Sequence, residues 1–297
     1  QTSTATKNVS SITSTATSKF GVGLKDDPDA IVAHYQKYPW LNAIHLHCGS
    51  QGVDIEDLVH GAFLVLGLVK RINKLRSKDQ PQVNHIDIGG GLPTDYVGES
   101  TLARFEEYAT RLRERCPSLW SGKYQLATEF GRALVAKSIC AISRVEYSKR
   151  SAGRHIATTH LGADYCLRAC YLPHQWMPVC SVYSGDGTYK DATTEEPVLS
   201  NIAGPLCFSG DLPIRKVVIP ELKRGDLAVI HDTGAYAMGM WSRYNSRQAP
   251  PTIGFRDALP SSPNSSLTDL AVSKLLDGQQ GVVVDNFDYF LVRRGET

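Results

Sequence analysis

The sequence predicts an α/β region over residues 1–136 followed by an all-β region over residues 137–297. In the first region, short apolar runs alternate with longer amphipathic stretches, which is the pattern of a parallel sheet or barrel whose strands are linked by helices. Beyond Val135 the chain changes to short β-rich runs separated by prolines and glycines, which is typical of a β-sandwich or β-barrel. We therefore expect two domains that meet at residues 136 and 137.

Helix and strand signals of the first region follow one another along the chain. Asp27 before Pro28 predicts a helix start, because aspartate caps the first turn and proline fits the first helical position. A second helix is predicted from Asp54, where apolar residues recur every three or four positions, and a third over about 100–115. Strands are expected at 42–47, 83–88 and 124–128, with a further strand end near residue 20.

The second region offers short runs rich in β-branched residues, each bounded by turn-forming residues. The expected strands lie at 139–145, 155–160, 216–219, 227–231 and 281–285. Residues 261–266 are expected to form a polar loop.

Composition narrows the classes of partner. Lysine and arginine number 32 and aspartate and glutamate 30, so the net charge of +2 gives no electrostatic footprint for nucleic acid or an anionic membrane. No apolar run approaches the roughly 18 residues that span a bilayer. The seven cysteines show no paired CxxC spacing, so we expect neither a disulfide framework nor a metal site, and a reducing, cytoplasmic location.

Residues 85–91 (HIDIGGG) are the stretch around which the first region is organised. A β-branched run that breaks into Gly89, Gly90 and Gly91 indicates a buried strand ending in a loop. Glycine leaves this backbone free to adopt positive φ and to bring its N–H groups against a ligand, for which phosphate is the natural choice. A tight strand-to-helix turn without a ligand explains the same residues, and this stretch alone does not decide between them.

Three further stretches resemble a known family when taken with the glycine run. Residues 45–51 (HLHCGSQ), 128–132 (TEFGR) and 204–211 (GPLCFSGD) resemble the pyridoxal-phosphate-dependent decarboxylases that act on ornithine, arginine and diaminopimelate. Residues 242–247 (SRYNSR) look most like the diaminopimelate branch. The resemblance implies the C-terminal part of a TIM-type (β/α)8 barrel followed by a β domain, with ligand-facing residues at the C-terminal ends of the strands. It also implies pyridoxal 5'-phosphate as cofactor and decarboxylation of an amino acid at Cα.

The resemblance assigns cofactor contacts to residues of the first region. His47 would stack on the cofactor ring, and Ser50 and Arg132 would contact its phosphate together with the glycine run. Glu129 matches the carboxylate that pairs with the pyridine nitrogen and keeps it protonated. The family's usual proline between Glu129 and Arg132 is Phe130 here, which leaves both charged groups in register. A structural histidine and a surface Glu–Arg pair on one helical turn are the alternatives for these residues.

The second region holds the residues that the resemblance brings to the substrate. Residues 204–211 resemble the segment through which each family subunit reaches into its neighbour's active site, so a homodimer with shared active sites is expected. Cys207 would be the thiol near the substrate Cα, with a small buried hydrophobe as the alternative. We also expect Asp211 to bind the substrate. Tyr236, in the sequence DTGAY, resembles the tyrosine that reaches the cofactor phosphate, and Arg168 loosely matches an arginine that binds the substrate carboxylate.

The residue after Cys207 departs from the family. In the ornithine and diaminopimelate enzymes it is acidic and meets the distal amine of the substrate, whereas here it is Phe208. Burying an unpaired ammonium against an aromatic ring costs several kcal/mol, and a cation–π contact recovers only about 0.5–2 kcal/mol. We therefore expect ornithine and lysine to be poor substrates. Diaminopimelate is less clearly excluded, since Arg168 or Arg243 could hold its distal carboxylate.

No lysine of the chain matches the family's Schiff-base lysine, which belongs to an early barrel strand upstream of the region that matches here. Three explanations are open: the chain is a fragment of a longer enzyme, a separate polypeptide supplies the rest, or the protein is a non-catalytic regulatory relative. We favour an inactive fragment, because so many cofactor contacts remain that have no use without a cofactor. An amino-acid racemase, which shares the fold, is the nearest chemical alternative.

Overall fold

The computed structural model describes residues 18–24, 27–96, 102–254 and 290–292. The chain divides into two compact units, Gln1–Ala136 and Lys137–Thr297. That residues 1–136 form a cofactor-binding domain and residues 137–297 a β domain stays a prediction. The expected strand at 281–285 and the expected polar loop at 261–266 lie outside the described residues.

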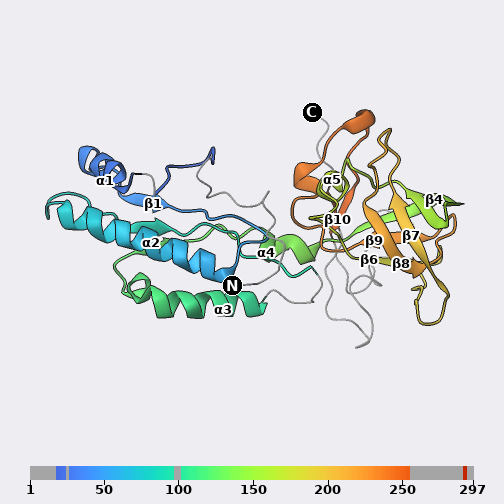
Figure 1. Ribbon diagram of the computed structural model, residues 1–297, viewed down its shortest axis with the longest axis horizontal. Coiled ribbons are helices and arrows are strands. Elements are labelled where there is room, and N and C mark those ends of the chain that lie inside the picture. The colour runs from blue at the N-terminus through green and yellow to red at the C-terminus, as the bar shows by residue number, and fades with distance from the viewer. Residues whose placement is uncertain (1–17, 25–26, 97–101, 255–289, 293–297) are drawn as a thin grey trace. The chain divides into compact units, whose positions relative to one another are not determined.

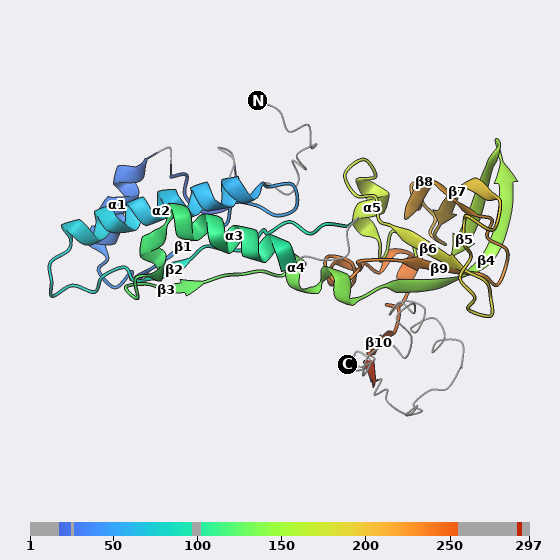
Figure 2. The same cartoon turned by 90° about the horizontal axis from the view of Figure 1, so that it is seen from below.

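In the first unit, parallel strands alternate with helices (Figure 1), which confirms the predicted α/β class. The strands pair in chain order and are β1 (Ala43–His45), β2 (His85–Asp87) and β3 (Gln125–Ala127). The longer helices are α1 (Pro28–Lys37), α2 (Ile55–Leu75) and α3 (Leu102–Arg115). Figure 2 shows these three helices on one side of the sheet. Two short helices, η2 (Pro117–Trp120) and α4 (Arg132–Val135), complete the described elements up to residue 135, and η3 (Ala136–Ser138) follows.

The helices begin where the sequence predicts. The Asp27 carboxylate accepts the N–H of Ala30 at 2.8 Å and Pro28 is the first helical residue, so α1 has the expected cap. Helix α2 buries most of its apolar positions; Leu75 at its end is 58% exposed, and Phe63 is 45% exposed and packs on the guanidinium of Arg115 on α3. Among the described helices, none combines the length and apolar character that crossing a membrane requires.

The sheet of the first unit has one apolar and one polar face. Ile44 and Ile86 belong to the core beneath the helices, and Ile86 is 1% exposed. The residues that follow them, His45 and Asp87, must point to the opposite face, because neighbouring side chains of a strand alternate. The polar face at the C-terminal ends of the strands is therefore the part of this unit that is open to a ligand.

The expected strand end near residue 20 is wrong for the described residues. Residues 18–24 form bends and a turn, and Phe20 and Val22 are 61% and 77% exposed. An apolar pair separated by Gly21, which takes φ +62°, is too short a signal to specify a buried strand.

The second unit is built on a six-stranded sheet in the order β6–β9–β4–β5–β7–β8. Its edge strands β6 and β8 contact each other, so the sheet curls toward a barrel, as the predicted all-β class requires. Strands β5 and β7 are parallel and the other neighbours antiparallel. The strands are β4 (Ala141–Ser151), β5 (Arg154–Thr159), β6 (Cys180–Tyr183), β7 (Pro197–Ala203), β8 (Ile214–Pro220) and β9 (Leu227–Ile230).

Four of the expected runs of the second region form β4, β5, β8 and β9, whereas β6 and β7 were not expected. Strands β10 (Thr252–Gly254) and β11 (Phe290–Val292) pair with each other outside the main sheet. The helical segments are α5 (Leu167–Tyr171), η4 (Met238–Met240) and η5 (Tyr244–Ser246).

Arg76, at the end of α2, ties separate segments of the first unit together. Its side chain donates to the carbonyl oxygens of Tyr35 at 2.7 Å, Leu41 at 2.9 Å and Pro81, and the residue is only 7% exposed. We expect Arg76→Met to lower the free energy of unfolding by about 2 kcal/mol, because three part-buried carbonyls lose their donor. Urea denaturation followed by circular dichroism measures the change.

Arg71 on the same helix provides the matched control for this prediction. Its ion pair with Asp29 is exposed, so Arg71→Met should change the free energy of unfolding by less than about 1 kcal/mol. Equal effects of the two substitutions would contradict the structural role of Arg76.

Candidate functional site

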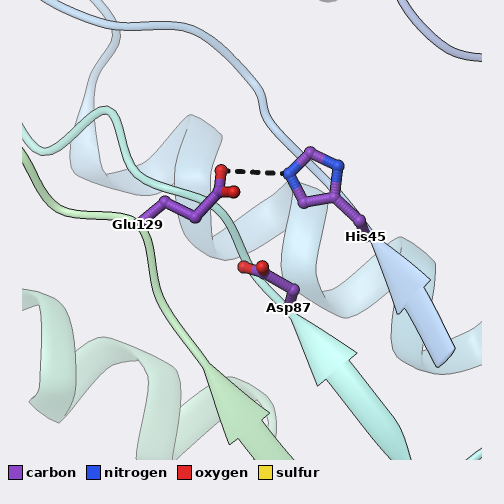
Figure 3. Close-up of side chains that lie close together, drawn as sticks. All are labelled: His45, Asp87 and Glu129. Atoms are coloured by element: carbon purple, nitrogen blue, oxygen red, sulfur yellow. Dashed lines mark hydrogen bonds and ion pairs between the residues drawn. The ribbon is translucent and has the colours of Figure 1, made fainter.

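Side chains from all three strand ends converge on the polar face of the first unit (Figure 3). His45 and Asp87 are register partners at the ends of β1 and β2, and Glu129 comes two residues after β3. His45 Nε2 lies 3.1 Å from Glu129 Oε2, and His47 Nδ1 lies 4.0 Å from the same oxygen. The sequence predicted Glu129 and His47 here, whereas His45 and Asp87 were not among the predicted site residues. The Glu129 carboxylate is thereby oriented by the His45 imidazole, with His47 close by.

Among the described residues, this cluster is where a cation would find both imidazole and carboxylate ligands. His45, Asp87 and Glu129 each offer one donor atom, and these atoms lie within 4.8 Å of one another. All three residues are at least partly exposed, and exposed acidic groups are common without an ion. The expectation that the chain has no metal site stays a prediction.

The glycine run lies beside this cluster and is packed against the neighbouring strand ends. A Cβ on Gly89 would lie 2.2 Å from the carbonyl oxygen of Leu46, one on Gly90 2.4 Å from that of Glu129, and one on Gly91 2.0 Å from that of Gly49. Gly89 and Gly91 have φ of +70° and +92°. The close approach of three backbones therefore requires glycine, with or without a ligand.

Two N–H groups of the glycine run already have partners in the cluster. Gly89 N–H donates to the Asp87 carboxylate at 2.8 Å, and Gly90 N–H donates to His47 Nδ1 at 3.3 Å. Because His47 Nδ1 accepts this hydrogen bond, the proton of the neutral imidazole lies on Nε2. A phosphate would meet Gly89 and Gly90 only by displacing these bonds, so the predicted contacts of these two glycines stay a prediction.

Arg132 forms a second group at the same end of the unit. Its residue is 5% exposed, and it begins α4, directly after the loop that carries Glu129. Arg132 Nε and Nη2 lie 3.3 and 3.4 Å from Ser50 Oγ, and Nη1 donates to the Tyr96 hydroxyl at 2.6 Å. A buried guanidinium beside two hydroxyl groups is a donor set suited to a phosphate or carboxylate. The surface Glu–Arg pair considered for the sequence is therefore ruled out for Arg132, which is buried.

Tyr96 was missed by the sequence analysis, because it follows the glycine run at no recognisable spacing. A pair of reciprocal hydrogen bonds holds its loop in place. Gln51 Nε2 donates to the Thr94 carbonyl at 2.7 Å, and Thr94 N–H donates to Gln51 Oε1 at 2.9 Å. The loop after β1 and the loop after β2 are thereby braced together, with Ser50 on one and Tyr96 on the other.

The remaining predicted residues lie in the second unit, and Asp211 takes a different place there from the expected one. It is 4% exposed, and its carboxylate accepts the N–H of Ala163 at 2.6 Å and of Leu206 at 2.7 Å. Burial raises the pKa of Asp211 above its usual range, against the effect of these hydrogen bonds. A Cβ on Gly162 or Gly204 would lie within 2.5 Å of this carboxylate, so both glycines make room for it. This geometry favours a role inside the loop over the predicted contact with substrate.

Cys207 and Phe208 project from the loop that Asp211 holds. Cys207 is exposed, which argues against the alternative of a small buried hydrophobe. The Phe208 ring stacks on Tyr171 with centroids 4.9 Å apart, and a Cβ on Gly210 would lie 2.4 Å from it. Phe208 is thus held by aromatic stacking, in place of the acidic residue that the family carries at this position.

Arg168 and Tyr236 are brought together in the second unit. The Arg168 guanidinium carbon lies 4.5 Å from the ring centroid of Tyr236 and 4.8 Å from that of Trp176. Tyr236 has φ +59°, a strained value for a tyrosine, and is 44% exposed. Its loop is anchored by an ion pair of 2.8 Å between Asp232 and Lys137. The predicted residues therefore divide between the two units.

Comparison with known proteins identifies the family of the first unit. A family model described as "Pyridoxal-dependent decarboxylase, pyridoxal binding domain" matches residues 1–136. The diaminopimelate decarboxylase of Escherichia coli K12 is 33% identical over 252 residues, which are 80% of this chain and 56% of that protein. Over residues 1–136, the chain belongs to the pyridoxal-dependent decarboxylases. The predicted resemblance is thereby confirmed, and with it pyridoxal 5'-phosphate as the implied cofactor.

Further decarboxylases agree with this membership. The diaminopimelate decarboxylase of Bacteroides thetaiotaomicron is 30% identical over 244 residues, covering 80% of this chain and 58% of that protein. The crystal structure of diaminopimelate decarboxylase from Helicobacter pylori complexed with L-lysine matches with a TM-score of 0.66 at 28% identity, over 80% of this chain and 55% of that chain. The predicted fold class is confirmed. The chain spans little more than half the length of the relatives that it matches.

The residues of the first unit fit pyridoxal phosphate by their chemistry. Arg132 with the Ser50 and Tyr96 hydroxyls offers donors for a phosphate, and Glu129 offers an acceptor for a protonated pyridine nitrogen. These opposite requirements are met within one unit of the chain.

Proposed function

We propose that this chain acts in pyridoxal-phosphate-dependent decarboxylation of an amino acid at Cα. Two contacts at the strand ends of the pyridoxal-binding unit carry the proposal. The buried Arg132 contacts hydroxyl groups, and Glu129 contacts His45. The bound cofactor would supply the electron sink for the carbon that loses its carboxylate.

In this proposal, the site residues of the first unit have distinct tasks. Arg132, Ser50 and Tyr96 hold the phosphate, and the glycine run lets the strand ends approach it closely. Glu129 accepts the hydrogen bond of the protonated pyridine nitrogen, and His45, at 3.1 Å, orients that carboxylate. His47 packs against the ring, with its Nε2 proton set by the hydrogen bond from Gly90 to Nδ1.

Residues of the second unit would handle the substrate. Arg168 would bind the substrate carboxylate and Tyr236 the cofactor phosphate. The Arg168 guanidinium already lies over the Tyr236 ring. Cys207 would hold a proton near Cα. Phe208 offers no counter-charge to a distal ammonium, so ornithine and lysine would be poor substrates, and diaminopimelate would need an arginine for its distal carboxylate.

We also propose a homodimer with shared active sites and a cytoplasmic location. The dimer proposal is supported by the family resemblance of residues 204–211, and it would give each active site a Cys207 from the neighbouring subunit.

Calorimetric titration of the purified chain with pyridoxal phosphate tests the proposed function. We expect saturable binding at one site per chain. Once a Schiff-base lysine is supplied, we expect more carbon dioxide release from diaminopimelate than from ornithine or lysine. Release is measured for the chain and for the chain extended by whatever coding sequence precedes Gln1. A chain that binds no pyridoxal phosphate, with or without that extension, would overturn the proposal. A release from ornithine that exceeds all other substrates would overturn the role given to Phe208.

A further inference from the structure

The backbone of Cys207 is held by two consecutive side chains in the second unit. The Tyr244 hydroxyl donates to the Cys207 carbonyl at 2.9 Å, and Asn245 Oδ1 accepts the Cys207 N–H at 3.1 Å. The backbone N–H and carbonyl groups of Cys207 are thereby both hydrogen-bonded, as they would be by a neighbouring β-strand. We call Tyr244 and Asn245 the clamp.

The segment that carries the clamp is fastened on both sides to a buried residue. Ser242 N–H donates to the Asp164 carbonyl at 2.9 Å, and Arg247 Nε donates to the Asp164 carboxylate at 2.9 Å. Arg247 also donates to the His160 carbonyl at 2.9 Å. Asp164 is 3% exposed, so the clamp is mounted on the interior of the unit.

The clamp segment adopts a backbone conformation that its residues do not prefer. Asn245 has φ 55° and ψ 28°, and Ser246 has φ 57°. Left-handed conformations of residues other than glycine persist only where the surroundings impose them, and asparagine accepts them more readily than most. The anchors on Asp164 and the bonds to Cys207 are the contacts that impose this conformation.

The residues on either side of Cys207 are held independently of the clamp. Leu206 N–H is bonded to the Asp211 carboxylate, and Phe208 is stacked on Tyr171. Of the seven cysteines, Cys207 is the exposed one. The loop therefore fixes the backbone around a thiol that it leaves open to solvent.

We propose that Tyr244 and Asn245 are positioning residues, which hold the Cys207 thiol in one place for the reaction. The importance of this position rests on the proposed function, in which Cys207 acts near the substrate Cα. The clamp itself is a property of the chain without cofactor. It can therefore be tested separately from decarboxylation.

Hydrogen–deuterium exchange of the peptide that spans residues 204–211 tests the clamp in the whole chain without cofactor. Asn245→Gly removes the acceptor but accepts the left-handed backbone, so exchange of the Cys207 N–H should become about tenfold faster, the effect of losing one ordinary hydrogen bond. Asn245→Asp keeps an acceptor oxygen and should exchange at the wild-type rate. Tyr244→Phe, which removes one hydroxyl oxygen, provides a second variant that should fold.

A nitroxide attached to Cys207 gives a readout on the side chain itself. We expect a sharper spectrum in Asn245→Gly and Tyr244→Phe than in the wild type, and an unchanged one in the control Arg243→Ala, an exposed neighbour in the same segment. Wild-type exchange and wild-type nitroxide spectra in both clamp variants would overturn the proposal. If the clamp variants respond as expected but pyridoxal phosphate does not bind, the proposed function fails while the clamp stands.

Discussion

Replacing Arg132 by alanine is expected to weaken the binding of pyridoxal phosphate roughly 100-fold, which corresponds to about 2.7 kcal/mol. Arg132 is 5% exposed and lies beside the Ser50 and Tyr96 hydroxyls, so a phosphate bound there would accept charge-assisted hydrogen bonds from a largely desolvated guanidinium. Such bonds contribute about 1.5–3 kcal/mol each, more than neutral ones. Calorimetric titration of the variant with pyridoxal phosphate measures the loss.

Pyridoxal, which lacks the phosphate, is the matched ligand control for Arg132→Ala. Its affinity should change by less than about twofold, because Glu129 and His47 remain in place and pyridoxal lacks the phosphate that Arg132 is proposed to bind. Arg132→Lys keeps the charge but not the planar fork, and an intermediate loss of about tenfold is expected. Equal losses for both ligands would show that the variant damages the whole site. No loss for either would place the phosphate elsewhere.

The sequence identified Glu129 and Arg132 of this site but not the residues around them. Glu129, Arg132 and Ser50 belong to short motifs with fixed spacing, and strand alternation places their neighbours on one face. Tyr96 contacts Arg132 across 36 residues, a partnership that depends on the path of the loop after β2. The register of β1 against β2, which sets His45 opposite Asp87, depends likewise on hydrogen bonds between distant strands.

Asp211 shows why local sequence misleads about burial. An aspartate after a glycine usually indicates an exposed turn, and the resemblance placed it near the substrate. In the fold, Gly162 and Gly204 leave space for its carboxylate, and two backbone N–H groups bind it. Neither Gly162 nor the N–H of Ala163 is near Asp211 in the sequence, so the enclosed carboxylate is a tertiary feature.

The fold was predictable where amphipathic periods are long and caps are present. Helix α1 has the predicted cap, α2 and α3 have long amphipathic periods, and strands β1, β2 and β3 follow from their alternation with these helices. The short run near residue 20 satisfies neither, and strands β6 and β7 carry mixed polar and apolar residues that give a weak period. The run near residue 20 and strands β6 and β7 were not predicted correctly, because their conformation is set by their sheet neighbours or by solvent.

Replacing Gly91 by alanine is expected to lower the free energy of unfolding of the first unit by about 2–5 kcal/mol in the absence of any ligand. The added Cβ would lie 2.0 Å from the carbonyl oxygen of Gly49, and φ at this position is +92°. Overpacking against rigid backbone costs about 1–3 kcal/mol, and a left-handed alanine about 1–2 kcal/mol more. Urea denaturation followed by far-ultraviolet circular dichroism measures the effect.

Gly122 separates these two contributions, because it has φ +77° but would place its Cβ in open space. Gly122→Ala should therefore cost only about 1–2 kcal/mol, the strain of the backbone alone. Gly67→Ala, within α2 and also in open space, should stabilise the unit by up to about 1 kcal/mol. If Gly91→Ala were no worse than Gly122→Ala yet abolished the binding of pyridoxal phosphate, Gly91 would serve the ligand and not the packing of strand ends. The expected order of stabilities would show that the glycine run serves the packing of the backbone, and that the cofactor site is built on this packing.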